Sequence, residues 1–397
     1  MPGHFPGEKE KPPMNLMKAA NQWACRPDDE RFESLDSLLA DRIHLRDCSS
    51  EKRLLLDKTT VVDSAGEVCI VGQSGTTAKL THHAFGQLAQ KASAPAGYLR
   101  GLPAPLAAAC LADGLKLRAE SGTDDRGLFY TNGCGPFVRA LTSDKYARVW
   151  DASIVERMID LQGNGWRVPP ARPVRDGQRG ARLATQADVL AFGSHDSLGI
   201  KVGDPIAPAG LYASDHDLFV FMVDNARTIN TPTGPLSRGF FAWNSEVGAA
   251  SFGIMTFLFD AVCGNHIVWG ASNVREIRVR HVGQALRRSF GAVQMQLREY
   301  SNASASEEEG RIERMTTRIL GGKKEEVVSA IFGKKLPGLT RGILESAYDV
   351  AESTPRYGNP NTVWGMVCGL TEASQASGFA DARNVIDVSA GKLIDVF

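Results

Sequence analysis

The sequence lacks the features that mark membrane, secreted and metal-cluster proteins. No stretch approaches the roughly 18 uninterrupted apolar residues of a membrane-spanning helix. No basic-then-apolar segment opens the chain in the manner of a secretory signal. The seven cysteines are so widely spread that the closest two are 21 positions apart, which excludes the CxxC spacing of zinc and redox motifs. We therefore expect reduced thiols, a cytoplasmic protein and no membrane partner.

An excess of charge of either sign is also lacking. Lysine and arginine together number 45, as do aspartate and glutamate, so the formal net charge is zero. A uniformly basic coat is thereby excluded, and any nucleic-acid site must be a local patch. The remaining composition, 43% hydrophobic and 23% charged over 397 residues, is ordinary for a globular protein with a sizeable core.

Three common catalytic signatures are absent. Neither GxxxxGK[ST] nor GxGxxG occurs, which disfavours an ATP-driven recombinase or helicase of the P-loop type and a dinucleotide-binding domain. GxSxG does not occur either, which disfavours the usual nucleophile elbow of hydrolases. We predict no cofactor, and a binding protein is favoured over an enzyme.

The local patterns divide the chain into three parts. Residues 1–30 form a flexible arm rich in proline, glycine and alternating charge. Residues 31–300 are predicted to form an α+β core domain, although the charged segment 28–60 fits either strand or helix. Residues 301–397 have helical patterns throughout. The expected fold is α+β, with a helical N-terminal segment, a central antiparallel sheet carrying a basic strand–helix unit, and an all-helical C-terminal region.

The clearest early helix follows Thr81, a good N-cap. Apolar residues at 84, 85, 88 and 89 share one face of this helix, and a second helix after Pro103 completes a helical hairpin. Alternation over 137–141 then predicts a strand. In the centre, the apolar run 218–223 and the segment 249–259 also predict buried strands. The aromatic run 240–243 is typical of core, with stacking on nucleic-acid bases as the alternative.

A basic strand and helix stand out against the neutral background. The segment from Ala271 to Tyr300 holds six arginines and two glutamates. Alternation over 274–282 predicts a strand, and an amphipathic helix follows. Arginine forks match phosphate oxygens, and a nearby aromatic can stack on bases. The candidate nucleic-acid contacts are Arg278, Arg280, Arg287 and Arg298, then Arg139, Lys145 and Arg148, with Tyr146 for stacking. The alternative is a solvated surface without ligand.

A second group of residues is acidic and contains histidine. Its members are His195, Asp215, His216, Asp217 and Glu246. Carboxylates with a histidine can hold Mg²⁺ or Mn²⁺ for phosphodiester cleavage. The alternative is a turn before a strand, where acidic residues are common.

Several segments, in order, resemble a family of phage- and plasmid-encoded proteins known as "domain of unknown function 932". The matching motifs are the helical segment 80–88, Pro95 with Tyr98 and Leu99, the RAxxSDxY segment 139–146, the NSExG segment 244–248, the CxN segment 263–265, and Arg280–His281. The resemblance spans about 80–300 and departs from the family at His266, where glycine is frequent. More distantly, the order of elements resembles the Rad52-like single-strand annealing proteins.

The two resemblances imply the expected function. Rad52-like proteins are non-enzymatic rings that hold single-stranded DNA in a basic groove on a β-β-β-α core. The chain would then bind and anneal single-stranded DNA in phage or plasmid recombination as a homo-oligomeric ring or filament. Two alternatives remain: a metal-dependent nuclease or related hydrolase, and a mobile-element interaction protein without nucleic-acid binding.

Overall fold

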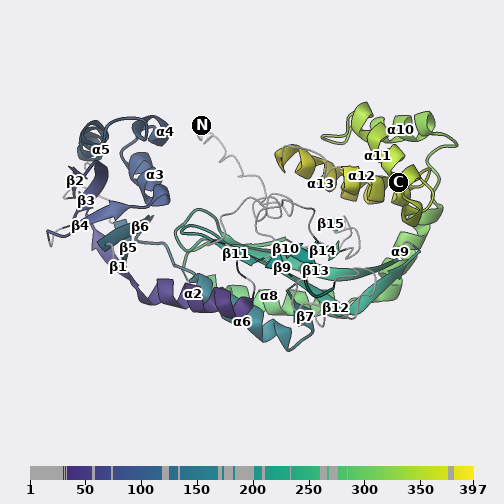
Figure 1. Cartoon of the computed structure of the whole chain (residues 1–397), viewed down its shortest axis with the longest axis horizontal. Helices are drawn as coiled ribbons and strands as arrows, with labels where there is room; N and C mark the ends of the chain where they lie inside the picture. The colour runs from purple at the N-terminus through teal and green to yellow at the C-terminus, as the bar shows by residue number, and fades with distance from the viewer. Residues whose placement is uncertain are drawn as a thin grey trace, which may run out of the picture.

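The computed structural model is elongated (Figure 1). A small sheet with helices lies at one end, a long antiparallel sheet in the middle, and a group of helices at the other end. The structure describes residues 30, 32, 34–55, 59–72, 75–118, 125–132, 135–168, 172–173, 182–183, 201–207, 211–232, 234–259, 266–267, 276–283, 285–373 and 380–397. The predicted N-terminal arm lies outside these residues, apart from residue 30.

The N-terminal lobe is a six-stranded sheet covered by helices. Its strands are β1 (Ser49–Leu54), β2 (Thr60–Ser64), β3 (Glu67–Val71), β4 (Thr77–Leu80), β5 (Asp125–Asn132) and β6 (Gly135–Ser143), in the order β1-β5-β6-β4-β3-β2. Only the β4–β6 pair is parallel among these neighbours. The helices are α3 (His82–Lys91), α4 (Ala96–Leu99) and α5 (Ala104–Arg118).

The predicted helical hairpin is confirmed, because Thr81 caps α3 by accepting a hydrogen bond from the amide of Ala84 at 3.2 Å. The expectation of a helical N-terminal segment holds only in part, since four strands lie between residues 49 and 80 beside the helices. These strands have four to six residues each. In β1 the four central positions are all exposed, so an edge strand shows no apolar alternation.

The central sheet is antiparallel in every described pairing, which confirms that part of the prediction. Its strands are β7 (Trp166–Arg167), β11 (Leu211–Ala213), β12 (Leu218–Thr231), β13 (Gly234–Asn244), β14 (Phe252–Phe259), β15 (His266–Ile267) and β16 (Glu276–Val279). A separate small sheet joins β8 (Arg172–Pro173), β9 (Arg182–Leu183) and β10 (Pro205–Ala207).

Helices α2 (Leu35–Asp47), α6 (Asp151–Gln162) and α8 (Ala285–Asn302) lie along one side of the central sheet (Figure 1). Leu38, Met158 and Leu297 from these helices pack with Phe240 and Ala242 of β13 in one buried cluster. Segment 28–60, left open from sequence, therefore contains both a helix and a strand. The amphipathic pattern predicted for α8 is confirmed, since Leu297 is buried and Arg298 exposed.

The other face of the central sheet carries a buried aromatic cluster. Phe241 and Trp243 of β13 point to this face, opposite to Phe240. The aromatic run is therefore core on both faces, as its spacing indicated. Trp243 pairs in register with Gly253 of β14, and a Cβ atom on Gly253 would lie 2.0 Å from the indole ring. Glycine is required here because the ring lies against the neighbouring backbone.

The C-terminal region is helical, as predicted. Its helices are α9 (Ala305–Thr317), α10 (Lys324–Phe332), α11 (Arg341–Ser353), α12 (Val363–Ala373) and α13 (Ala380–Val396). Ile229 and Leu236, at the far end of the β12–β13 pair, belong to its buried core. A buried ion pair of 2.6 Å between Arg238 of β13 and Glu308 of α9 ties the sheet to these helices. Within the described ranges, no helix has the length and apolar character needed to cross a membrane.

Candidate nucleic-acid interface

Two basic segments that are far apart in sequence lie side by side in the structure. Tyr146 and Val282 form an antiparallel bridge, and the amide of Ala147 donates a hydrogen bond of 2.8 Å to the carbonyl of His281. The segment that contains Lys145 therefore runs beside the end of the predicted basic strand. No feature of either segment alone indicated this pairing.

The predicted alternation of the basic strand holds where the structure describes it. Arg278 and Arg280 are exposed, while Ile277 and Val279 pack against the core shared with α8. Lys145 is exposed as well. Three of the predicted cationic residues thus lie on the surface of two adjoining segments.

A tyrosine–histidine pair fixes these two segments to each other beneath the surface. The hydroxyl of Tyr146 makes a short hydrogen bond with Nδ1 of His281 and donates to the carbonyl of Ser245 at 3.0 Å. The amide of Phe252 donates to Nε2 of His281 at 3.1 Å. Nε2 is therefore unprotonated and Nδ1 carries the hydrogen, which makes the imidazole neutral. Burial, with the nearby charge of Arg148, lowers the pKa of His281 to about 4.

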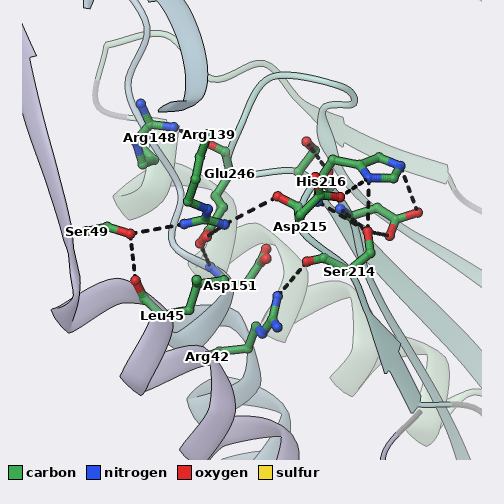
Figure 2. Close-up of polar contacts among 12 residues, drawn as sticks. Arg42, Leu45, Ser49, Arg139, Arg148, Asp151, Ser214, Asp215, His216 and Glu246 are labelled. Carbon is green, nitrogen blue, oxygen red and sulfur yellow. Dashed lines mark hydrogen bonds and ion pairs between the residues drawn. The ribbon is translucent and has the colours of Figure 1, made fainter. Parts of the chain in front are cut away.

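Arg139 makes a buried ion pair at the centre of a junction where β6, the turn after β13 and the start of α6 meet (Figure 2). Its Nη2 lies 2.5 Å from Oε1 of Glu246, and the two side chains are 2% and 3% exposed. Its Nη1 donates to Oγ of Ser49 at 3.2 Å. The second oxygen of Glu246 accepts the amide of Asp151 at 3.0 Å. A single carboxylate thus joins β6, the turn after β13 and the start of α6.

Arg148 occupies an adjacent buried position. Its Nε lies 2.5 Å from Oε1 of Glu51, and its guanidinium also donates to the carbonyl of Glu246. The carbon at the centre of the guanidinium lies 5.3 Å from the centroid of the Tyr146 ring and 5.7 Å from that of Trp150. The Arg148 side chain is only 3% exposed, so these contacts enclose it.

Asp151 is a second buried carboxyl group in the same junction. Asn244 donates to its Oδ1 at 2.7 Å and to the carbonyl of Val149 at 2.9 Å. Burial, reinforced by the charge of Glu246, raises the pKa of Asp151 to about 8. At neutral pH the Asp151 carboxyl is therefore mostly protonated, and the junction does not hold two adjacent charged carboxylates.

The predicted acidic group forms a local turn. Oγ of Ser214 accepts the amides of His216 and Asp217 at 3.2 Å each. Nδ1 of His216 lies 2.6 Å from Oδ1 of Asp215, and this hydrogen bond lowers the pKa of Asp215. The ring of His216 stacks on His83, with 5.9 Å between the centroids.

The candidate metal ligands that the structure describes are not assembled into one group. Glu246 is engaged by Arg139, Asp215 and Asp217 lie in the turn, and His195 lies outside the described residues. In the part of the chain that the structure describes, no three or more His, Cys, Asp or Glu residues are arranged to hold a metal ion.

The structure corrects the predicted set of nucleic-acid contacts. Arg139 and Arg148 have their guanidinium groups inside the protein because buried or partly buried carboxylates bind them. The hydroxyl of Tyr146 is also used internally. Arg298 is exposed but lies thirteen positions beyond the start of α8, roughly 20 Å along the helix axis. The side chain of Arg287 lies outside the described residues.

Sequence reasoning missed the junction, although a signal for it existed. Three of the motifs on which the expected resemblance was based supply its members, namely Arg139 and Tyr146, then Asn244 to Glu246, then His281. The CxN motif at 263–265 lies outside the described residues.

Replacing Asp151 with asparagine is expected to flatten the pH dependence of stability. The folded protein keeps the Asp151 proton up to about pH 8, whereas the group's ordinary pKa is 3.8. Asp151 therefore lowers the free energy of unfolding as pH rises between these values. His281, neutral when folded down to about pH 4 and normally titrating at 6.5, has the opposite effect below 6.5. Between pH 6.5 and 8 only the Asp151 effect remains, so the free energy of unfolding of the parent protein is expected to fall by about 1.4 kcal/mol per pH unit.

Urea unfolding of both proteins at several pH values in this window measures the effect. Asparagine keeps the shape of the protonated carboxyl and the acceptor for Asn244, so the variant should fold. An Asp151→Asn protein whose stability falls with pH as steeply as that of the parent would contradict the assignment.

Comparison with known proteins relates the chain to one family. A family model described as "Domain of unknown function (DUF932)" matches residues 188–390, just over half of the chain. The matched region contains Glu246 and His281, whereas Arg139 and Tyr146 precede it. No curated protein and no solved structure matches the chain.

Proposed function

The chain belongs to the family described as domain of unknown function 932, and from that premise we propose that it binds and anneals single-stranded DNA in phage or plasmid recombination. The proposal includes a homo-oligomeric ring or filament and no chemical catalysis. One observation carries it: the two basic segments predicted from sequence adjoin each other through the Tyr146–Val282 bridge. Annealing needs neutralised backbones and accessible bases, and an exposed cationic strip supplies the first of these.

The exposed cations suit a phosphate backbone better than a defined base sequence. Arg278 and Arg280 alternate with core residues, so both project from the same side of β16 and the segment after it. Guanidinium groups spaced along an extended strand can contact successive phosphates by bidentate hydrogen bonds. Such contacts give affinity that depends on salt and little on sequence.

The buried junction supports the same proposal by fixing the backbone beneath the cations. His281 directly follows Arg280, and its ring is held by Tyr146 and by the amide of Phe252. Because the imidazole is neutral above about pH 4, it places no competing charge inside the protein. The surface arginines therefore extend from an ordered support, which lowers the entropy cost of binding.

The order of elements is in keeping with the resemblance to Rad52-like annealing proteins. Strands β12, β13 and β14 are consecutive antiparallel neighbours. The basic strand β16 pairs with β14, and α8 follows it in sequence. Within the proposal, β12, β13, β14 and α8 would correspond to the β-β-β-α core on which a single strand lies, with β15 and β16 inserted between β14 and α8.

Replacing Arg278 and Arg280 together with alanine is expected to weaken the binding of single-stranded DNA by about tenfold or more. Each lost phosphate contact should reduce the slope of log affinity against log salt by about 0.7. Fluorescence anisotropy with a labelled oligonucleotide at several salt concentrations measures both quantities. The matched control is Lys116→Ala with Arg157→Ala, which removes two side chains that are 74% and 53% exposed on other helices.

The outcomes separate the competing functions. A double variant with an unchanged salt slope would reject the assignment of Arg278 and Arg280. An oligonucleotide shortened only when Mg²⁺ or Mn²⁺ is added would favour a nuclease. Absence of binding by the parent protein at low salt would reject both and leave an interaction protein without nucleic-acid binding.

A further inference from the structure

The loop between α10 and α11 carries a second cluster of exposed cations, remote in sequence from the first. Lys334 and Lys335 lie in this loop, and Arg341 is the first residue of α11. The loop is joined to α13 by a hydrogen bond of 2.7 Å from Ser389 to the carbonyl of Pro337. Lys392, exposed on α13, stands three residues after Ser389 and so lies on a neighbouring part of the same helix face.

No carboxylate among the described residues is bonded to any of these four cations. Elsewhere Lys324 lies 2.5 Å from Asp349, and Arg311 lies 2.6 Å from Asp395 in the last turn of α13. The nearby acidic group of α13 is thus already engaged. A cluster of uncompensated cations creates a local positive potential on a protein whose net charge is zero.

Two aromatic rings in this cluster each have a cation over the ring, although Phe332 remains 42% exposed. The guanidinium of Arg341 lies 4.9 Å from the centroid of Phe332, and Nζ of Lys334 lies 4.4 Å from that of Phe397. Base stacking on single strands needs free aromatic faces. Because a cation already lies over each ring, the cluster suits the sugar–phosphate backbone better than unpaired bases.

The backbone conformation of Lys335 independently indicates that its side chain has a role in binding. Its backbone has φ of 53°, in the left-handed region, where glycine is the residue without strain. The loop itself is anchored, since Leu339 is buried and Leu336 packs against the helical core. A lysine in this position costs conformational energy that a glycine would not, and its exposed ammonium group has no carboxylate partner among the described residues to offset that cost.

We propose that this cluster of four cations (Lys334, Lys335, Arg341 and Lys392), called the hairpin site below, binds the backbone of double-stranded DNA. A duplex presents one negative charge per about 1.7 Å of axis, twice the density of one strand, and so suits several cations gathered at one loop. The inference rests on the proposed function for the identity of the polymer. It adds a binding place for the duplex that annealing produces, separate from the strand-binding surface at Arg278 and Arg280.

The test uses the full chain with Lys334→Ala and Lys335→Gly. Glycine adopts the left-handed backbone conformation at position 335 without strain, so the variant should be at least as stable as the parent. Thermal unfolding measures this stability. Duplex affinity should fall about tenfold or more, with the salt slope reduced by up to about 1.8, while single-strand affinity should change less. Lys116→Ala with Lys323→Ala, two exposed lysines away from the loop, is the matched control.

The outcomes separate failure of the hairpin site from failure of the proposed function. Unchanged duplex affinity in a folded Lys334→Ala, Lys335→Gly protein overturns the hairpin site, even when Arg278→Ala with Arg280→Ala weakens single-strand binding as expected. An equal loss for single strands and duplexes overturns the duplex assignment. Failure of the parent to bind either DNA overturns both this inference and the proposed function.

Discussion

Replacing Glu246 with alanine is expected to lower the free energy of unfolding by about 3–5 kcal/mol. The change leaves the guanidinium of Arg139 buried without its partner at 2.5 Å. It also removes the acceptor of the Asp151 amide. An uncompensated buried charge costs far more than a lost surface pair. Urea unfolding measures the loss.

The matched control is Glu67→Ala. Glu67 also pairs with a cation, Lys79 at 2.8 Å, but both side chains are about half exposed. Its removal should cost at most about 1 kcal/mol. A further variant, Arg139→Met with Glu246→Leu, replaces both charges by apolar groups and should recover part of the stability. A Glu246→Ala loss no larger than that of Glu67→Ala would refute the central role of the pair.

Replacing Gly253 with alanine is expected to cost about 2–4 kcal/mol. The new Cβ would lie 2.0 Å from Cζ2 of Trp243, far inside any real contact distance. The indole is a buried ring of a packed aromatic cluster and lies 5.3 Å from Phe241, centroid to centroid. It is not a flexible side-chain end, so either the ring or the strand must shift, which is the usual origin of large overpacking losses.

Gly291→Ala is the matched control for this substitution. Gly291 lies within α8, and no neighbouring atom approaches within 4 Å of the position that a Cβ would take. Alanine should therefore stabilise the helix by up to about 1 kcal/mol. In a Trp243→Phe background the loss from Gly253→Ala should shrink, because a smaller ring leaves room. Equal effects of the two glycine substitutions would contradict the steric account.

Sequence patterns predicted the elements whose periodicity reflects burial on one face. Helix α8 and the strand that contains Arg278 each have one apolar and one polar side, and the structure keeps those sides. The strands between residues 49 and 80 were not predicted. They are short, and the charged positions of β1 lie at the sheet edge, where local composition favours no single structure.

The buried position of Arg139 shows why the site was only partly predictable from the sequence. Alternation along 137–141 correctly makes a strand, and it places Arg139 on the face opposite to Val138. The strand departs from strict alternation here, because Leu128 pairs with Ala140 and Phe129 pairs with Val138, which leaves Arg139 as an extra residue between them. Ala140 and Leu128 pack against Val247, and Glu246, next to Val247, binds the buried guanidinium of Arg139. The ion partner lies 107 residues away, and no local pattern encodes such a contact. Whether an arginine on a strand is exposed therefore depends on which other segment packs over that strand, and the local pattern does not specify that segment.

The long β12–β13 pair has a consequence for how two DNA-binding places would cooperate. Strand β12 has 14 residues, about 46 Å at 3.3 Å per residue. One end, where Leu218 pairs with Asn244, enters the buried junction, and the other enters the helical core at Ile229. The pair, which is hydrogen-bonded on both sides of a register shift between Asp224 and Thr228, holds these two regions apart. A DNA molecule that reaches both places is a bivalent ligand, and the effective concentration for its second contact depends on a fixed span instead of on linker fluctuations. Avidity would then set in at a threshold DNA length and not increase gradually.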